Sequence, residues 1–393
     1  MFFEITSRLP GTLARTDIIH TAHGDIKTPT FLPVGTFGFV KFVEMDDLRK
    51  INAEAMLSNA YHLRRESYAR GLADHNGWHG PTFTDSGGFQ VMSLGSGLGK
   101  VVSMTREKPL ENTAKKDRLA KVTEEGVHFT DPFDGTPSFI GPEESMQIQC
   151  KIGSDIHMAF DELTSLADDY DYTKTSLART ERWALRSLKE HEKHKMDLGY
   201  EQHLYAVLQG GHWEDLRRST ARFLSQHPFD GFGLGGAFLK EDLGAILRWC
   251  DEELPENKPR HLLGLSHPDD IFVGVENGAD TFDCVAPTRE ARHGKIYTKK
   301  GNINLRKFAD SAEPLDEDCD CPTCKQGCTR GQLRALWRSG DLEKKQQYYN
   351  LASVHNLRFI LKLTEDIRTS IDSGTFFDFK RKFLDNYQNR VNI

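Results

Sequence analysis

The sequence has no apolar run that approaches the roughly 20 residues needed to span a bilayer. Its N-terminal stretch, MFFEITSRLPGTLART, also lacks the basic segment followed by an apolar one that marks a signal peptide. No low-complexity linker and no clear short repeat occurs. We therefore expect a cytoplasmic protein without a membrane partner. Its 393 residues are enough for one large barrel with an appendage or for several ordinary domains.

Cysteine is scarce, and its distribution argues against a disulfide framework. The chain has seven cysteines, an odd number, and three of them lie within CDCPTC, Cys319–Cys324. This pattern suits a reducing compartment and a metal site better than paired disulfides.

Thiolates at C-x-C-x-x-C spacing can wrap around one tetrahedral ion, and a distant histidine in NLASVHNLRF can close the fourth position. Such closure leaves no open position, so the metal would be structural. We predict a zinc ion (Zn2+) held by Cys319, Cys321, Cys324 and His355, with Cys328 as the alternative fourth ligand.

The chain as a whole lacks an excess of positive charge, because its formal net charge is −7. That value argues against indiscriminate nucleic-acid binding but leaves room for a local basic surface. Two segments are locally basic. Cys284–Ala309 has seven basic residues against Glu290 alone, and Lys100–Lys121 has seven against three acidic ones. Taken alone, such runs are most simply solvated faces.

Short apolar segments alternate with amphipathic ones along most of the chain. Eight of them are predicted strands, over residues 31–34, 55–59, 81–85, 156–161, 204–209, 231–235, 261–265 and 280–285. Helical patterns separate the later strands, over residues 172–195, 213–224, 242–250 and 268–277. This alternation implies parallel pairing. Eight near-continuous apolar strands favour an α/β fold with a closed (β/α)8 TIM barrel over a doubly wound open sheet.

Polar and small residues stand at the carboxyl ends of these strands, the face where barrel enzymes place their active sites. A single carboxylate there would most simply cap a helix or a turn. Three carboxylates with two amides and a glycine pair predict a clustered site instead: Asn59, Asp85, Asp161, Gln209, Gly235, Gly236 and Asp283.

From about residue 310 the strand alternation stops. The cysteine segment is followed by predicted helices over 332–337, 341–349 and 351–371. We therefore expect residues 1–309 to form the barrel with the catalytic site, and residues 310–393 to form a zinc-binding helical subdomain packed on it.

Six segments resemble, in order, the hallmark sequences of bacterial-type tRNA-guanine transglycosylases (queuine tRNA-ribosyltransferases): TDSGGFQVMSL, VTEEGVHF, GSDIHMAFDE, FDCVAPTREARHG, CDCPTC and the VHNL histidine. The resemblance runs from about residue 3 to residue 387. It implies a barrel with a zinc subdomain that exchanges guanine at the anticodon wobble position for a 7-deazaguanine, with retention. It also implies a tRNA with a GUN anticodon as partner, and a homodimer formed through the zinc-bearing region.

Retention at an anomeric carbon requires two displacements, so one carboxylate attacks while a second group moves protons. Asp283 matches the family's nucleophile, which attacks ribose C1′ and holds a covalent RNA intermediate. Asp85 matches the general acid/base that assists guanine departure and deprotonates the incoming base. Because the nucleophile must stay ionised while the acid/base changes state, the two environments should differ.

The resemblance also implies a base pocket. Asp161 would accept hydrogen bonds from the N1–H and 2-amino edge of a guanine-like base, and Gln209 with the backbone at Gly236 would address O6. Phe89 would stack on the base, its alternative being a core phenylalanine. The other expected members are Asn59 and Ser86, which would support Asp85, and Gly235, Ala237 and Leu263.

Two arginines directly follow the predicted nucleophile. Beside a reactive aspartate and a phosphodiester, they are expected to orient the carboxylate or the RNA backbone. The target base must leave its stack to enter the pocket. The expected RNA-binding residues are Arg289, Arg292, Lys295, Lys299 and Lys300.

The sequence departs from the family in two places. The interval 95–122 is longer than in family members and basic, and the sequence does not choose between RNA contact, gating of the pocket and disorder. The Ala237-Phe238-Leu239 loop is bulkier than the family's small loop, and Leu163 replaces a smaller residue. A tighter wall favours the compact aminomethyl base preQ1 over queuine.

Two other functions stay open. A retaining barrel glycosidase would use Asp85 and Asp283 with water, but it leaves Asp161 and Gln209 unexplained. A non-catalytic tRNA-binding subunit would be expected to lack the nucleophile.

Overall fold

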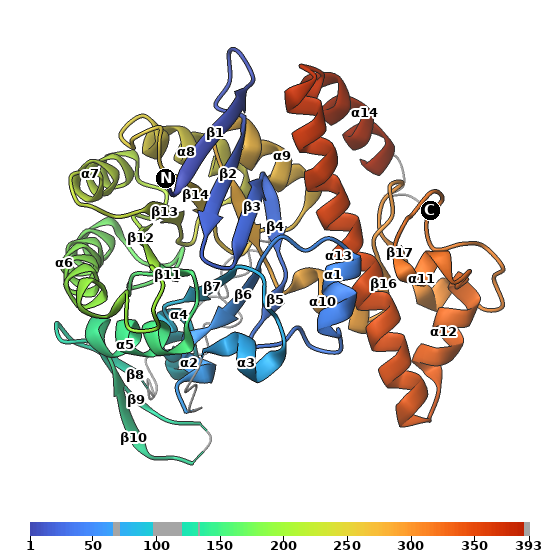
Figure 1. Cartoon of the computed structure of the whole chain (residues 1–393), viewed down its shortest axis with the longest axis horizontal. Helices are drawn as coiled ribbons and strands as arrows, with labels where there is room; N and C mark the ends of the chain where they lie inside the picture. Colours follow the sequence, from blue (N-terminus) through green and yellow to red (C-terminus); the bar gives the residue numbers. More distant parts are fainter. Residues whose placement is uncertain (66–70, 97–119, 133, 389–393) are drawn as a thin grey trace.

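The computed structural model describes residues 1–65, 71–96, 120–132 and 134–388 (Figure 1). Its centre is a parallel sheet, whose strands in chain order are β4 (Thr30–Leu32), β5 (Val34–Gly35), β6 (Met56–Asn59), β7 (Thr82–Asp85), β11 (Ile156–Met158), β12 (His203–Leu208), β13 (Gly231–Leu234), β14 (Arg260–Leu262) and β15 (Thr281–Asp283). They pair in the order β4-β15-β14-β13-β12-β11-β7-β6-β5.

Pro33 explains why nine strands make an eight-position barrel. It alone separates β4 from β5, and it has no N–H to give to a ladder. Strand β4 pairs with β15 and β5 pairs with β6, so the two halves of one strand close the ring. The Pro33 carbonyl still accepts from the Leu57 amide at 3.0 Å. The predicted (β/α)8 barrel is confirmed, and each of the eight predicted strands overlaps an observed one.

A second sheet covers the amino ends of the barrel strands. It is antiparallel and consists of β1 (Phe3–Arg8), β2 (Arg15–Thr21) and β3 (Gly24–Thr28). Ile19 and Ile26 of this sheet join a buried cluster with the barrel residues Leu57, Phe83 and Tyr205. Sequence reasoning did not predict this sheet. Because it closes the amino end of the barrel, the carboxyl end is the one open to a substrate.

Helices surround the barrel. They are α1 (Met45–Lys50), α2 (Ala60–Leu63), α3 (Leu72–Asn76), α4 (Gly88–Ser96), α5 (Pro142–Ile152), α6 (Tyr170–His194), α7 (Glu214–Ser225), α8 (Leu243–Asp251), α9 (Pro268–Glu276) and α10 (Ala286–Arg292). The four helices predicted between the later strands are found within about two residues of their expected ends. A small antiparallel sheet that was not predicted, β8 (Ala120–Val122), β9 (Val127–Thr130) and β10 (Pro137–Ile140), lies between α4 and α5 in the chain. Most of the predicted insertion, residues 97–119, lies outside the described residues.

The C-terminal part contains the hairpin β16 (Lys295–Ile296) and β17 (Ile303–Asn304), the 3₁₀ helix η3 (Leu305–Lys307), and α11 (Pro322–Lys325), α12 (Arg330–Arg338), α13 (Leu342–Asp372) and α14 (Phe376–Gln388). The two helices predicted over 341–349 and 351–371 are one helix, α13, which packs against α10 and β4 (Figure 1). Asn350, at the expected break, keeps its helical backbone because its side chain bonds outward to Phe42 O and Asp47. In the described part of the chain no helix is both long and apolar enough to cross a membrane.

Candidate active site and metal centre

Asn59 and Asp85 end neighbouring strands and lie opposite each other in the β6–β7 ladder. Asn59 caps α2, because its Oδ1 accepts from the His62 amide at 3.2 Å. That bond turns the Nδ2 atom toward Asp85, to which it donates at 2.6 Å. The amide of Gly87 donates to the other carboxylate oxygen at 3.1 Å. The orientation of Asp85 is thus set from two sides, which agrees with the supporting role predicted for Asn59.

Two opposing effects set the proton affinity of Asp85. Burial, followed by the negative charge of Asp283, raises the pKa of Asp85 to about 7, while the hydrogen bonds from Gly87 and Asn59 lower it. The group is therefore divided between its acid and base forms near neutral pH, as a proton-transfer residue requires. The effect of Asp283 also means that the two carboxylates are close enough to sense each other.

Asp161 follows β11 and is held by two other predicted residues. Ser86 Oγ donates to its Oδ1 at 3.2 Å, and Gln209 Nε2 donates to its Oδ2 at 2.6 Å. Burial raises the pKa of Asp161 to about 6, although the hydrogen bonds from Gln209 and Ser86 favour the ionised carboxylate and lower the pKa. Ser86 was predicted to support Asp85, so this is a correction: its hydroxyl donates to Asp161, because Ser86 follows β7, which pairs with β11, the strand that leads to Asp161.

The glycine pair after β13 lies against Gln209 and a buried arginine. Gly236 has φ +105, and a Cβ atom there would come within 2.8 Å of Gln209 Oε1 and 2.9 Å of an Arg217 terminal nitrogen. Arg217, on α7, is fully buried and donates to the carbonyls of Gly211, Leu208 and Gly235. It ties the ends of β12 and β13 together. Sequence reasoning missed it, because an arginine in an amphipathic helix resembles any surface cation.

Asp283 ends β15 with its carboxylate partly exposed. Its Oδ1 atom accepts from the Gly264 amide at 3.0 Å and lies 3.2 Å from Nε2 of His261, a fully buried residue of β14. Sequence reasoning did not select His261. The available signal was its place in the strand, because His261 lies within β14 and opposite Thr281 in the ladder, two residues before Asp283.

The remaining predicted base-pocket residues lie on the same end of the barrel. Phe89, at the start of α4, is 38% exposed and is therefore not a core phenylalanine. Leu263, directly after β14, is half-buried. Ala237 is buried, and the ring of Phe238 packs against Arg217 within the main core cluster. Val285, two residues after Asp283, is a further exposed apolar side chain that was not predicted.

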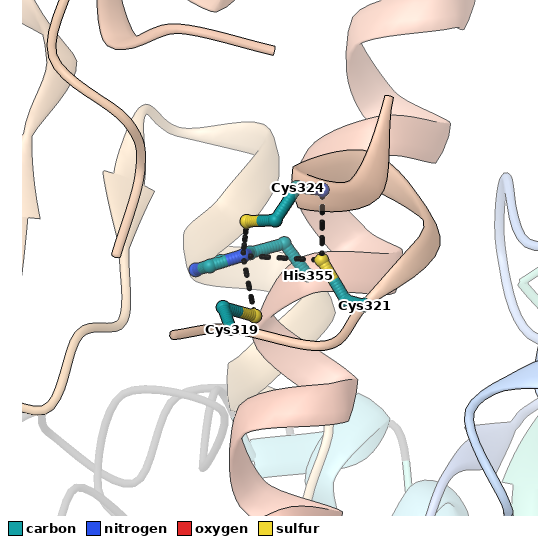
Figure 2. Close-up of side chains that lie close together, drawn as sticks. All are labelled: Cys319, Cys321, Cys324 and His355. Atoms are coloured by element: carbon teal, nitrogen blue, oxygen red, sulfur yellow. Dashed lines mark hydrogen bonds between the residues drawn. The ribbon is translucent and has the colours of Figure 1, made fainter. Parts of the chain in front are cut away.

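The four predicted metal ligands converge in the C-terminal part (Figure 2). His355, on α13, directs Nδ1 at three sulfurs, 3.6 Å from Cys319, 3.5 Å from Cys321 and 3.3 Å from Cys324. A tetrahedral zinc site has a sulfur-to-nitrogen edge of about 3.5 Å, given its usual bond lengths. The Nε2 atom of His355 bonds to the Tyr297 carbonyl at 2.8 Å, which leaves Nδ1 free to bind a metal.

The residues therefore fit a tetrahedral metal ion, and Cys328 is not part of the group. A second group, Cys150, His157 and His191, also lies within ligand distance. It supplies three ligands, one fewer than a closed tetrahedral shell. Burial lowers the pKa of His191 to about 4 and raises that of the Cys150 thiol to about 12, so we assign this trio to a neutral network of the core.

Comparison with known proteins distinguishes the transglycosylase from the two alternatives, a retaining glycosidase and a non-catalytic tRNA-binding subunit. The family model described as Queuine tRNA-ribosyltransferase matches residues 11–389. The chain belongs to the queuine tRNA-ribosyltransferase family. Queuine tRNA-ribosyltransferases of Staphylococcus aureus strains JH9, Mu50 / ATCC 700699 and N315 are each 40% identical to it over 385 residues, which cover 95% of this chain and 93% of each relative. As a family member it is an enzyme, a pentosyltransferase.

Of the five residues predicted to bind RNA, two form ion pairs in the structure. Lys295 pairs with Glu290 and Lys300 pairs with Glu317, each at 2.8 Å. Arg292 has a buried NH1 atom without a hydrogen-bond partner in the described part of the chain, and burial lowers its pKa. The other two predicted residues, Arg289 and Lys299, are exposed.

Proposed function

We propose that this enzyme exchanges guanine at the wobble position of a tRNA with a GUN anticodon for a 7-deazaguanine, through a covalent intermediate between Asp283 and ribose. The observation that carries the proposal is the difference between two neighbouring carboxylates. Asp283 is partly exposed and held by two nitrogen groups, whereas the pKa of Asp85 is raised to about 7. One group suits nucleophilic attack and the other suits proton transfer.

In the first displacement an oxygen of Asp283 attacks C1′ of the ribose. The bond from C1′ to the base nitrogen breaks, its electron pair goes to the departing guanine, and protonated Asp85 gives that guanine a proton. In the second displacement ionised Asp85 takes a proton from the incoming base. The base nitrogen then attacks C1′, and the bond from C1′ to Asp283 breaks. Two inversions give net retention.

Base selection would rest on Asp161 and its partners. Gln209 and Ser86 hold the carboxylate of Asp161 with both oxygens satisfied in the free site. A guanine-like edge with N1–H and 2-amino donors suits such a carboxylate, and adenine has no such pair of donors. Arg217 fixes the Gly235 carbonyl, which keeps the glycine pair in place beside Gln209.

The test is incorporation of labelled guanine into tRNA that contains a U-G-U anticodon sequence. The wild-type enzyme should incorporate label, and Asp283→Ala should not. A denaturing gel should show a protein–RNA adduct with the wild type and none with the variant. Label uptake by Asp283→Ala would overturn the nucleophile assignment, and no uptake by the folded wild type would overturn the proposed function.

We also propose preQ1 as the preferred incoming base. The loop after the glycine pair supports this proposal: Phe238 packs against Arg217 in the core, and we expect so bulky a loop to leave less room for a larger 7-substituent. Competition of preQ1 with queuine against labelled guanine tests this preference. Equal or stronger inhibition by queuine would contradict it.

The metal and assembly are further parts of the proposal. The Cys319, Cys321, Cys324 and His355 set would hold zinc as a structural ion, outside the reaction itself. We expect a cytoplasmic homodimer formed through the zinc-bearing residues 310–393. Light scattering at several protein concentrations would test the dimer, and a monomeric mass throughout would contradict it.

A further inference from the structure

Two neighbouring loops at the carboxyl end of the barrel contribute to the site. Strands β13 and β14 pair in parallel, so the loops that follow them leave the sheet side by side. Residues 235–242 connect β13 to α8 and include the glycine pair beside Gln209. Residues 263–267 connect β14 to α9 and include Gly264, whose amide donates to Asp283 at 3.0 Å. The relative position of the two loops therefore affects both the base pocket and the nucleophile.

An ion pair between Lys240 and Asp270 joins the far ends of these loops. Lys240 begins the 3₁₀ helix η2 (Lys240–Asp242), and its Nζ atom lies 2.9 Å from Oδ2 of Asp270, in the first turn of α9. The first half of the β13 loop is fixed by burial, because Phe238 belongs to the main core cluster. The loop then reaches the surface at Leu239, which is 42% exposed. Lys240 holds this outer half of the loop.

The environment of Asp270 distinguishes this contact from an ordinary surface ion pair. The Asp270 side chain is 7% exposed, whereas that of Lys240 is 39% exposed. A fully exposed pair contributes little, because water screens both charges. A carboxylate that has been removed from water needs a partner instead. Burial raises the pKa of Asp270, and the bond from Lys240 lowers it. Lys240 is thus the cation that favours the ionised form of a buried carboxylate.

A simpler interpretation is that Asp270 stabilises the start of its own helix together with Asp269, as acidic residues in a first turn do. That role does not require a lysine from the neighbouring loop. Helices α8 and α9 are also joined at their other ends, because Arg248 donates to Asn277 at 2.9 Å. The pair thus fixes the active-site end of two helices whose opposite ends are already connected.

We propose that Lys240 is a positioning residue for the base exchange. Through Asp270 it holds residues 235–242 against residues 263–267, so that the base pocket keeps its place relative to Asp283. A loop that is already ordered binds the base without a further loss of conformational entropy. Loss of the ion pair should therefore weaken binding of the base more than it slows the chemical step. The proposal rests on the proposed function, since it takes a guanine-like base as substrate.

The first test is the steady-state kinetics of guanine incorporation at saturating tRNA. Lys240→Met should raise the KM for guanine about five- to tenfold, between the effect of an exposed ion pair and that of a hydrogen bond to a buried charge. The kcat should change less than about twofold. Lys240→Arg keeps the cation and should restore most of the affinity. The double variant K240M/D270N should be no worse than Lys240→Met, because both substitutions remove the same contact.

The second test measures the loop without catalysis. Amide hydrogen exchange of peptides from residues 235–242 should be faster in Lys240→Met than in the wild type, because the outer half of the loop loses its contact with α9. Lys240→Arg should exchange at nearly the wild-type rate. Peptides from strand β11, residues 156–158, should exchange equally in all three proteins and report that the barrel is intact.

The matched control is Arg222→Met. Arg222 pairs with Glu253 at 2.7 Å and is likewise a cation that joins neighbouring segments of the barrel surface. It lies in the last turn of α7, and each barrel helix returns the chain to the start of the next strand. The control therefore removes an ion pair at the end of the barrel opposite the site. Its KM for guanine and its exchange over residues 235–242 should equal those of the wild type.

Three outcomes would overturn the positioning role and leave the proposed function intact, provided that the wild type incorporates guanine. They are a wild-type KM in folded Lys240→Met, an equal rise of KM in Lys240→Arg, and a lower kcat at unchanged KM. If the folded wild type incorporates no guanine, the proposed function fails. Hydrogen exchange then still decides whether Lys240 orders the loop, and wild-type exchange in Lys240→Met would show that it does not.

Discussion

The Nε2 atom of His261 lies 3.2 Å from Oδ1 of Asp283. The other ring nitrogen, Nδ1, lies 2.9 Å from Thr281 Oγ1. In the tautomer that donates from Nε2 to the carboxylate, Nδ1 is the acceptor, and Thr281 would be the donor that sets this tautomer. The Gly264 amide also donates to Oδ1. Because the His261 ring and the Gly264 amide both contact Oδ1, we expect Oδ2 to be the oxygen that attacks C1′ of the ribose.

Replacing His261 should slow the chemical step more than it weakens substrate binding. A hydrogen bond to a charged group is worth about 1.5–3 kcal/mol, so His261→Ala should lower kcat by about 10- to 100-fold. The amount of covalent protein–RNA adduct should fall with it. Thr281→Val should cause a smaller loss, and Thr281→Ser, which keeps the hydroxyl, should cause little. Wild-type kcat in His261→Ala would show that the contact does not position the nucleophile.

The pH dependence of guanine release should respond to Asn59. Its amide donates to Asp85, stabilises the ionised form and thereby lowers the pKa of Asp85. Asn59→Ala removes this bond, so the pKa should rise above about 7 and the protonated acid should persist to higher pH. The alkaline limb of single-turnover guanine release should shift upward. Asn59→Asp, which keeps the helix cap but adds a charge, should shift it further. A downward shift in either variant would contradict the acid assignment.

The free energy of unfolding should also depend on pH through the raised pKa of Asp85. The folded-state pKa of Asp85, about 7, lies above the unfolded value, so the folded state binds more protons between them. Stability therefore falls as pH rises from about 4 to about 7. Asp85→Asn removes this dependence, and its Tm should exceed that of the wild type by more at pH 8 than at pH 5. Thermal unfolding at both pH values measures the difference in Tm between the variant and the wild type. The same difference at pH 5 and at pH 8 would contradict the raised pKa.

The barrel could be predicted because its strands are buried on both faces and appear as continuous apolar runs. The run at residues 31–34 extends through Pro33, whose missing N–H divides one strand into β4 and β5 only when the ladders form. The β1–β3 sheet was missed because its strands are short and half-exposed. It is stabilised by packing on the amino ends of the barrel strands, a contact that the local sequence pattern does not indicate. The break expected within α13 was wrong, because Asn350 bonds to residues about 300 positions away.

The carboxylates proposed as catalytic were visible because polar residues at strand ends are unusual in apolar segments. Their supports were harder to find. His261 lies beside Asp283 only because β14 pairs with β15 in a register that forms on folding. Arg217 belongs to an amphipathic helix, whose sequence does not indicate that this arginine bonds to the Gly235 carbonyl. Basic residues were counted without their partners: Lys295 pairs with Glu290 and Lys300 with Glu317 in the structure, and their role in RNA binding stays a prediction.

Gly236 should not tolerate a side chain. Its φ is +105, and a Cβ atom would come within 2.8 Å of Gln209 Oε1 and 2.9 Å of Arg217. Gly236→Ala should therefore push Gln209 from Asp161 and raise the KM for guanine at least tenfold, if the Gln209–Asp161 bond sets base affinity. Gly199→Ala is the matched control, because Gly199 also has a positive φ but no atom within 4 Å of the Cβ position. An unchanged KM in Gly236→Ala would place the base elsewhere.

Metal binding should depend on Cys324 and not on Cys328. Cys324 Sγ lies 3.3 Å from His355 Nδ1, whereas Cys328 lies outside the ligand group. Purified protein should contain about one zinc per chain, and Cys324→Ser should lose most of it and lower Tm, because a structural metal contributes its binding free energy to folding. Cys328→Ser should keep both the zinc content and the Tm. Full zinc content in Cys324→Ser, or its loss in Cys328→Ser, would contradict the ligand set.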